Sequence, residues 1–74
     1  MIKINPVYID KFKKISQGYS YYDESIKGSI LYFNKNQEYT SYATYFDYLY
    51  IETKVYRCIE RLLKLGYLEI VEEW

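Results

Sequence analysis

Residues 51–66, IETKVYRCIERLLKLG, constrain the fold of this chain most strongly, because they combine an apolar face with a basic stripe. If the stretch is an α-helix, four apolar side chains share one face: Val55, Ile59, Leu62 and Leu63. Four basic side chains recur beside it at spacings of three, four and three residues: Lys54, Arg57, Arg61 and Lys64. The sequence therefore predicts a long helix that is capped by Thr53, ends at Gly66 and presents positive charge next to a buried face.

Shorter helices are predicted upstream. Asn5 can cap free amides and Pro6 suits the first helical position, so a helix is expected over residues 6–16 with Gly18 just beyond its end. Its apolar residues share a face: Tyr8, Ile9, Phe12 and Ile15.

Two more helices are expected in the middle of the chain. One follows an Asp23 cap and is weakened by Gly28. Its buried stripe consists of Ile26, Ile30, Leu31 and Phe33. The other covers about residues 42–48, with Ala43 and Phe46 pointing inward.

Strand signals are confined to short segments. Residues 67–74 alternate loosely, with Leu68 and Ile70 on one face. Residues 38–39 are expected to form a short strand, and residues 19–22 a short extended or loop segment. A full wing hairpin needs a returning strand, so the wing is expected either to be missing or to pair with an upstream segment, such as one of these two.

Length and composition narrow the class of protein. Residues 1–74 make one domain, since a chain of this size buries only about 60% of the surface that it exposes when unfolded. Half of the residues are apolar and 22% are aromatic, which excludes disorder on compositional grounds. Cys58 is the single cysteine and histidine is absent, so neither a zinc cluster nor a nucleophile with its base is available. No enzymatic activity, cofactor or small-molecule substrate is expected.

The location and charge of the chain set further expectations. No segment approaches the roughly 18 apolar residues of a membrane span, so a cytoplasmic protein without membrane contact is expected. The formal net charge is zero, which argues against duplex DNA binding driven mainly by phosphate neutralisation. Two basic segments, residues 1–15 and 54–64, alternate with two acidic ones, residues 37–53 and 65–74. The basic segments could still meet on one surface.

From residue 42 to residue 70 the pattern resembles a winged helix-turn-helix. The resemblance consists of a short helix, a turn, and a long helix that ends in Leu65-Gly66-Tyr67. It implies a mainly α fold with a small β element, in which a compact winged helix-turn-helix has a reduced wing. The same fold serves in DNA regulators, protein contacts and single-strand binding.

The chain is also similar in character to the small single-stranded-DNA-binding proteins of staphylococcal cassette chromosome elements, since it is short and rich in tyrosine. That resemblance implies binding of single strands in support of replication of a mobile genetic element. A replicative helicase would then be a partner.

The basic stripe is the first candidate nucleic-acid site. Lys54, Arg57, Arg61 and Lys64 could hold successive phosphates, and the lysines of residues 11–14 could extend the patch. These lysines are Lys11, Lys13 and Lys14. The alternative is a solvated helix face, with Glu60 paired to Arg57 or Lys64.

Tyrosine is the second signal, with twelve in 74 residues. Exposed rings beside positive charge suit stacking on unpaired bases, and Tyr42, Tyr45 and Tyr56 are the candidates for that role. Tyr8 and Tyr67 are assigned to the core. The alternatives are an AT-rich coding sequence, which inflates tyrosine content, and a protein interface, where tyrosine is enriched.

Single-stranded DNA binding with little sequence preference is therefore the leading hypothesis. A small regulator that inserts residues 53–64 into the major groove of double-stranded DNA is the second. A protein-binding adaptor or inhibitor module is the third.

Overall fold

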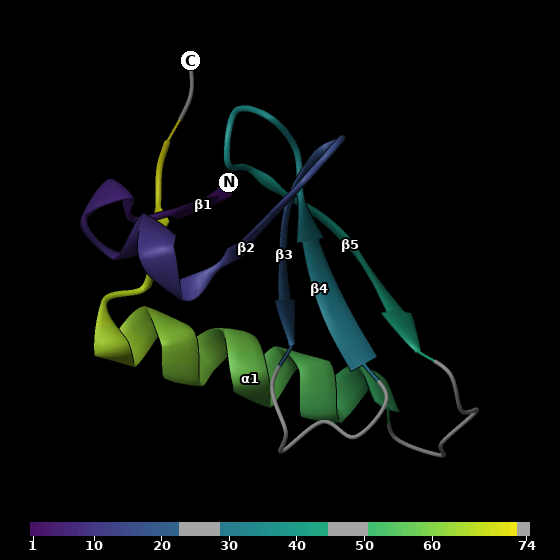
Figure 1. Cartoon of the computed structure of the whole chain (residues 1–74). Helices are drawn as coiled ribbons and strands as arrows, with labels where there is room; N and C mark the ends of the chain where they lie inside the picture. The colour runs from purple at the N-terminus through teal and green to yellow at the C-terminus, as the bar shows by residue number, and fades with distance from the viewer. Residues whose placement is uncertain (23–28, 45–50, 73–74) are drawn as a thin grey trace.

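The computed structural model describes residues 1–22, 29–44 and 51–72, and for residues 29, 44 and 51–54 it describes the backbone alone. Two three-residue strands and a 3-10 helix open the chain, and longer strands follow (Figure 1). In chain order the elements are β1 (Ile2–Ile4), η1 (Pro6–Lys11), β2 (Lys13–Ile15), β3 (Gly18–Tyr22), β4 (Ser29–Phe33), β5 (Tyr39–Thr44), α1 (Ile51–Leu65) and β6 (Leu68–Ile70).

Strands β2, β3, β4 and β5 form an antiparallel sheet in chain order. Tyr19 lies opposite Phe33, and Tyr21 lies opposite Leu31, so these side chains share one face of the sheet. The register between β4 and β5 shifts at Tyr32 and Phe33, which places one extra residue in β5. Aromatic and β-branched residues dominate these strands because they pack well on a half-buried pleated surface.

The two ends of the chain form a second, two-stranded antiparallel sheet. Strand β1 pairs with β6, with Ile4 opposite Leu68. An isolated bridge between Lys3 and Glu38, together with a hydrogen bond from the Ile4 amide to the Gln37 carbonyl, joins β1 to the start of β5. The small sheet therefore continues along the edge of the larger one.

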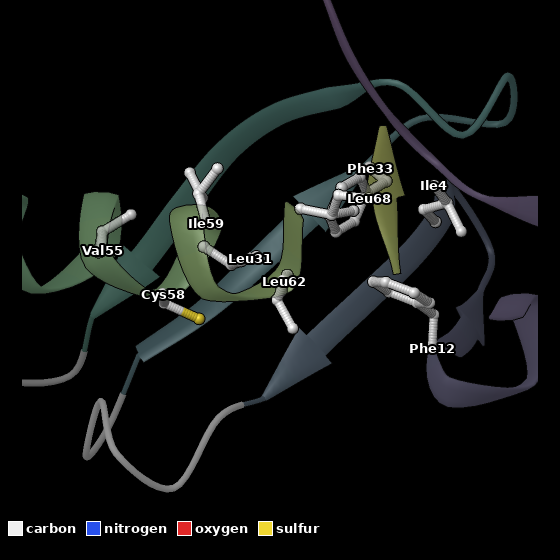
Figure 2. Packing of buried hydrophobic residues seen from close by; sticks show 9 residues of the cluster. All are labelled: Ile4, Phe12, Leu31, Phe33, Val55, Cys58, Ile59, Leu62 and Leu68. Carbon is white, nitrogen blue, oxygen red and sulfur yellow. The ribbon is translucent and has the colours of Figure 1, made fainter. Parts of the chain in front are cut away.

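Helix α1 covers one face of the four-stranded sheet and seals the core between them (Figures 1 and 2). The side chain of Leu62 on α1 is fully buried. Phe12 closes the core at the η1 end, where its ring contacts those of Phe33 and Tyr21. The buried apolar residues are Ile4, Phe12, Leu31, Phe33, Val55, Cys58, Ile59, Leu62 and Leu68. Among the described residues, no helix is long and apolar enough to cross a membrane.

The predicted mainly α fold with a winged helix-turn-helix is wrong. The described chain holds six strands in two antiparallel sheets and a single α-helix. Residues 30–33, read above as a helical stripe, form part of β4. A short continuous apolar run fits a buried helix or a buried strand equally well by periodicity, and here the aromatic neighbours favour the strand.

The helix predicted over residues 6–16 is also wrong beyond its first turns. Asn5 caps it as expected, because its side-chain oxygen accepts a hydrogen bond from the Val7 amide. The helix is a 3-10 helix that ends at Lys11, since Phe12 has an extended backbone and Lys13–Ile15 pair with β3. Gly18 begins β3 and does not end a helix.

The helix predicted over residues 42–48 is contradicted where it can be compared. Residues 42–44 belong to β5, and residues 45–48 lie outside the described residues. The Asp23 cap, Ile26, Gly28 and Phe46 lie outside them as well.

Several predictions for the C-terminal part are confirmed. Helix α1 ends at Leu65, and Gly66 follows with a φ of 82°. The helix begins at Ile51, so Thr53 lies inside it and is not its cap. A strand follows as predicted and pairs with an upstream segment, but that segment is β1 and neither of the two examples given, and Ile70 of the last strand is exposed.

Candidate nucleic-acid interface

The four-stranded sheet has a face turned away from α1, here called the open face. Leu31 and Phe33 point into the core, so the residues between and beside them on β4 point to the opposite side. The register extends this assignment across all four strands. The described side chains of the open face are Lys13, Ile15, Ser20, Tyr22, Ile30, Tyr32, Ser41 and Ala43.

Tyr32 sits in the middle of a row that crosses the sheet. Ser20 of β3 lies opposite it on one side and Ser41 of β5 on the other, and Lys13 of β2 lies opposite Ser20. Both neighbours of Tyr32 are small. Tyr32 is half-buried and Ser20 beside it is buried, so side chains of this row lie over Ser20, and a lysine ends the row.

Tyr22 lies in the next row of the open face. Tyr22 is 53% exposed. It lies opposite Ile30 of β4, and Ile30 lies opposite Ala43 of β5. An outward face of an antiparallel sheet is usually polar. This one carries two tyrosines, two isoleucines and an alanine, with Lys13 as the only charged side chain among those described. Its composition suits contact with flat apolar groups better than contact with water.

A hollow of about 450 Å³ lies at the end of the open face next to Tyr32. Polar side chains surround it, including Gln17, Asn34, Thr40 and Ser41. Thr40 is the extra residue of β5, and its hydroxyl donates a hydrogen bond to the Tyr32 carbonyl. The exposed Gln17 and Ser41 supply neutral donors and acceptors beside the half-buried Tyr32 ring, and such groups can hydrogen-bond the edge of a stacked base.

The turn next to this hollow is held by Asn34. Its side-chain oxygen accepts hydrogen bonds from the amides of Asn36 and Glu38, at 2.9 and 3.0 Å. Its side-chain amide donates to the Glu38 carboxylate at 3.0 Å. These bonds fix the turn between β4 and β5, and a left-handed Gln37 (φ 68°) completes it.

The basic residues predicted on the helix lie on its solvent side. Arg57, Arg61 and Lys64 are exposed on α1. Lys54 lies within α1, but its side chain is outside the described residues, as is the whole of Tyr45. Arg57, Arg61 and Lys64 therefore do not belong to the open face, whose described side chains all come from β2, β3, β4 and β5.

Tyr56 and Arg61 of α1 influence tyrosines on different strands. Burial raises the pKa of Tyr39 on β5, and the neighbouring Tyr42 and Tyr56 hydroxyls add to the rise. Burial also raises the pKa of Tyr21 on β3, where the positive charge of Arg61 acts against it. Arg61 therefore influences a ring of β3 and Tyr56 a ring of β5, while Arg57 directly follows Tyr56 in the chain and both are exposed.

The remaining predicted site residues are distributed over the molecule. Tyr42 is half-buried on the covered face of the sheet, packed against the core. Lys11 is exposed at the end of η1, and Lys14 is exposed on β2, opposite Tyr19. Tyr8 and Tyr67, which are predicted core residues, are both half-buried, and their rings contact each other at a tilt of 37° with centroids 4.8 Å apart.

The open-face residues were missed because β3 and β4 were not recognised as neighbouring strands. The signal for them is the alternation in Gly-Tyr-Ser-Tyr-Tyr, residues 18–22, which has a period of two. Tyr22 and Tyr32 share a face only once the register of these two strands is known.

Cys58 is unsuited to nucleophilic chemistry. It forms no disulfide and is buried, and burial raises the pKa of its thiol from 9.0 to about 11. The thiolate is the reactive form, so a thiol reagent at pH 8 should label Cys58 only when the chain unfolds.

The pKa of Cys58 also predicts a pH dependence of stability. The folded chain holds this proton to higher pH than the unfolded chain does, so its contribution is intact below pH 9 and is lost as the pH rises toward about 11. The free energy of unfolding, measured in urea, should therefore fall between pH 8 and about pH 10.5. Cys58→Ala should show a smaller fall, with a remainder from Tyr21 and Tyr39, whose pKa values are also raised. An equal fall in both proteins would contradict this assignment.

No group of three potential metal-ligating side chains occurs among the described residues. No family model matches the chain, and neither a curated protein nor a solved structure matches it. Both resemblances predicted from the sequence are therefore wrong. The described fold is not a winged helix. No family match supports the resemblance to the cassette-element proteins. A replicative helicase partner, which only the second resemblance implied, loses its support.

Proposed function

We propose that this chain binds single-stranded DNA with little sequence preference through the open face of its four-stranded sheet. The observation that carries the proposal is the pair of tyrosines on one face of adjacent strands, Tyr22 opposite Ile30 and Tyr32 between two serines. Every base has a flat face, so stacking on such rings tolerates any sequence.

The energetics of stacking suit a chain without net charge. Each stacked base contributes about 1–3 kcal/mol, so two rings can supply much of a micromolar affinity without a strongly basic surface. Lys13 at the end of the Tyr32 row can contact a phosphate beside a stacked base. Gln17 and Ser41 of the adjacent hollow can bond base edges.

The same features disfavour duplex DNA as the ligand. In a duplex the base faces are covered by stacking, so open-face tyrosines would have only backbone or groove edges to contact. A duplex-binding surface relies on neutralising many phosphates. The open face has one lysine among its described side chains.

The helix surface is the competing location for the same activity. It offers Arg57, Arg61 and Lys64 beside the exposed Tyr56, but Glu60 is exposed among them and reduces the positive charge there. The open face places its rings and its lysine in neighbouring rows. For this reason the proposal assigns the bases to the sheet.

Fluorescence anisotropy tests the proposed ligand. Labelled poly-dT and a labelled duplex of equal length are titrated with the protein at two salt concentrations. Poly-dT should bind more tightly than the duplex. Its affinity should fall only weakly with salt, by about 0.7 log units per log unit of salt concentration for each phosphate contacted.

The other outcomes identify the competing functions. Tighter binding of the duplex would contradict the proposal and favour a regulator of double-stranded DNA. Absence of binding to either nucleic acid would also contradict it, and would leave the open face as a surface for a protein partner.

A further inference from the structure

A second hollow, of about 280 Å³, lies where the turn between β2 and β3 meets the turn between β4 and β5. It is lined by Lys14, Ile15, Ser16, Gly18, Tyr19 and Lys35. Two of these six residues are lysines and none is acidic. The hollow therefore concentrates positive charge in a chain whose net charge is zero.

The walls of this hollow are fixed by the backbone. Gly18 packs so closely on the β4 end that a Cβ atom there would lie 2.1 Å from the Phe33 carbonyl oxygen. Lys35 sits in the turn that the Asn34 side chain holds through its bonds to Asn36 and Glu38. Lys14 is held by the pairing of β2 with β3. The stems of the two lysines therefore start from rigid positions on either side of the hollow.

The turn between β4 and β5 carries one carboxylate, that of Glu38, and it is hydrogen-bonded outside the hollow. Glu38 accepts a hydrogen bond from the Asn34 side chain and does not line the hollow. The two ammonium groups are thus available to an anion. A tetrahedral oxyanion such as a phosphate, with several acceptor oxygens, suits two lysines that approach from different elements.

The hollow is also adjacent to the candidate base-stacking site. Ile15 lines both hollows, and Gln17 lines the one beside Tyr32 while Ser16 and Gly18 line the other. Lys14 and Tyr19 lie on the covered face of the sheet and Tyr32 on the open face, so the end of the β2–β3 hairpin separates the two hollows. A chain of nucleotides that leaves Tyr32 over this hairpin reaches Lys14 and Lys35 next.

We infer that the hollow between Lys14 and Lys35 binds a phosphate group of the DNA strand whose bases stack on the open face. This inference rests on the proposed function for the source of the phosphate. The geometry of the hollow by itself supports the phosphate chemistry. The strand then has a defined path, from the tyrosines across the end of the β2–β3 hairpin.

Nuclear magnetic resonance tests the site with inorganic phosphate as the probe. Phosphate should shift the amide signals of Gly18 and Lys35 in a saturable way and leave that of Lys64 on α1 unchanged. The double variant Lys14→Ala/Lys35→Ala should lose the saturable shifts. Both lysines are exposed, so the variant should keep its fold, which the unchanged remainder of its spectrum would verify.

Anisotropy with poly-dT then tests the source of the phosphate. The double variant should bind poly-dT about tenfold more weakly than the wild type at low salt. Its salt slope should be shallower by about 0.7. Lys64→Ala, which removes an exposed lysine from the helix, is the matched control and should change neither value.

The outcomes separate the two proposals. Phosphate shifts that are spread evenly over all lysines, or that survive in the double variant, would overturn the site. Poly-dT binding with the same affinity and slope in the double variant would also overturn it and leave the proposed function standing. Saturable phosphate binding without any poly-dT binding would overturn the proposed function and assign the hollow to a small phosphorylated molecule.

Discussion

Replacing Gly18 by alanine should destabilise the fold by about 4 kcal/mol or more, a loss beyond that of most single substitutions. The residue has a φ of 146°, a conformation that L side chains rarely adopt. An added Cβ would lie 2.1 Å from the Phe33 carbonyl oxygen and 2.6 Å from the Asn34 carbonyl carbon. Both atoms belong to the backbone, so relief requires the β2–β3 hairpin to move away from β4.

Urea denaturation followed by circular dichroism measures this loss. Because small domains have only about 5–15 kcal/mol of stability in total, a large fraction of the Gly18→Ala protein should be unfolded at modest urea concentrations. Gly66→Ala is the matched control. It also has a positive φ, of 82°, but its Cβ would only reach ordinary contact with Tyr8 at 3.8 Å. Its cost should be about 1–2 kcal/mol. Equal losses in the two variants would contradict the close packing of the hairpin.

Removing the rings of the open face should have the largest effect on DNA binding. Tyr32→Ala and Tyr22→Ala should each weaken poly-dT binding by about 1–3 kcal/mol, which corresponds to about 5- to 150-fold. The salt slope should stay near the wild-type value, because neither ring neutralises a phosphate. Anisotropy titrations at two salt concentrations measure both quantities.

Two controls separate stacking from other roles of the rings. Tyr32→Phe keeps the aromatic face and should retain most of the affinity. Tyr56→Ala removes a ring that is 67% exposed on α1 and should leave the affinity within about twofold of the wild type. Loss of affinity in Tyr56→Ala with none in Tyr32→Ala would move the bases to the helix surface.

The helix was predictable from the sequence because its pattern is local and extends over several turns. Val55, Ile59 and Leu62 recur with the helical period over several turns, and they are buried in the structure. Gly66 marks the end of the helix through its backbone conformation alone. Such signals depend on neighbours within the same element, so no knowledge of the remaining fold is needed.

The sheet was not predictable in the same way. Each strand of the larger sheet has three to six residues, and its partner is known only from the tertiary structure. Asn5 and Pro6 are genuine helix-start signals, yet the helix ends at Lys11 because the pairing of β2 with β3 outweighs continued helix formation. Local caps indicate where a helix can begin and not how far it extends.

The candidate site could likewise be predicted in part, in its residue type and not in its position. Tyrosine enrichment and base stacking were expected from composition, but the expected rings were Tyr42, Tyr45 and Tyr56. Tyr42 packs against the core because β5 turns that side chain toward Leu31. Tyr22 and Tyr32 are presented together because the strands alternate and their register aligns them. Residue type was therefore readable from the sequence, and position was not.

The footprint of poly-dT on the protein tests the central claim most directly. Amide signals are recorded by nuclear magnetic resonance while unlabelled poly-dT is added to the isotope-labelled chain. The account predicts that the largest shifts fall on the strands of the open face, at Ser20, Tyr22, Tyr32 and Ser41, while residues 56–64 of α1 stay unchanged. Shifts confined to residues 56–64, with the open-face strands unaffected, would contradict it.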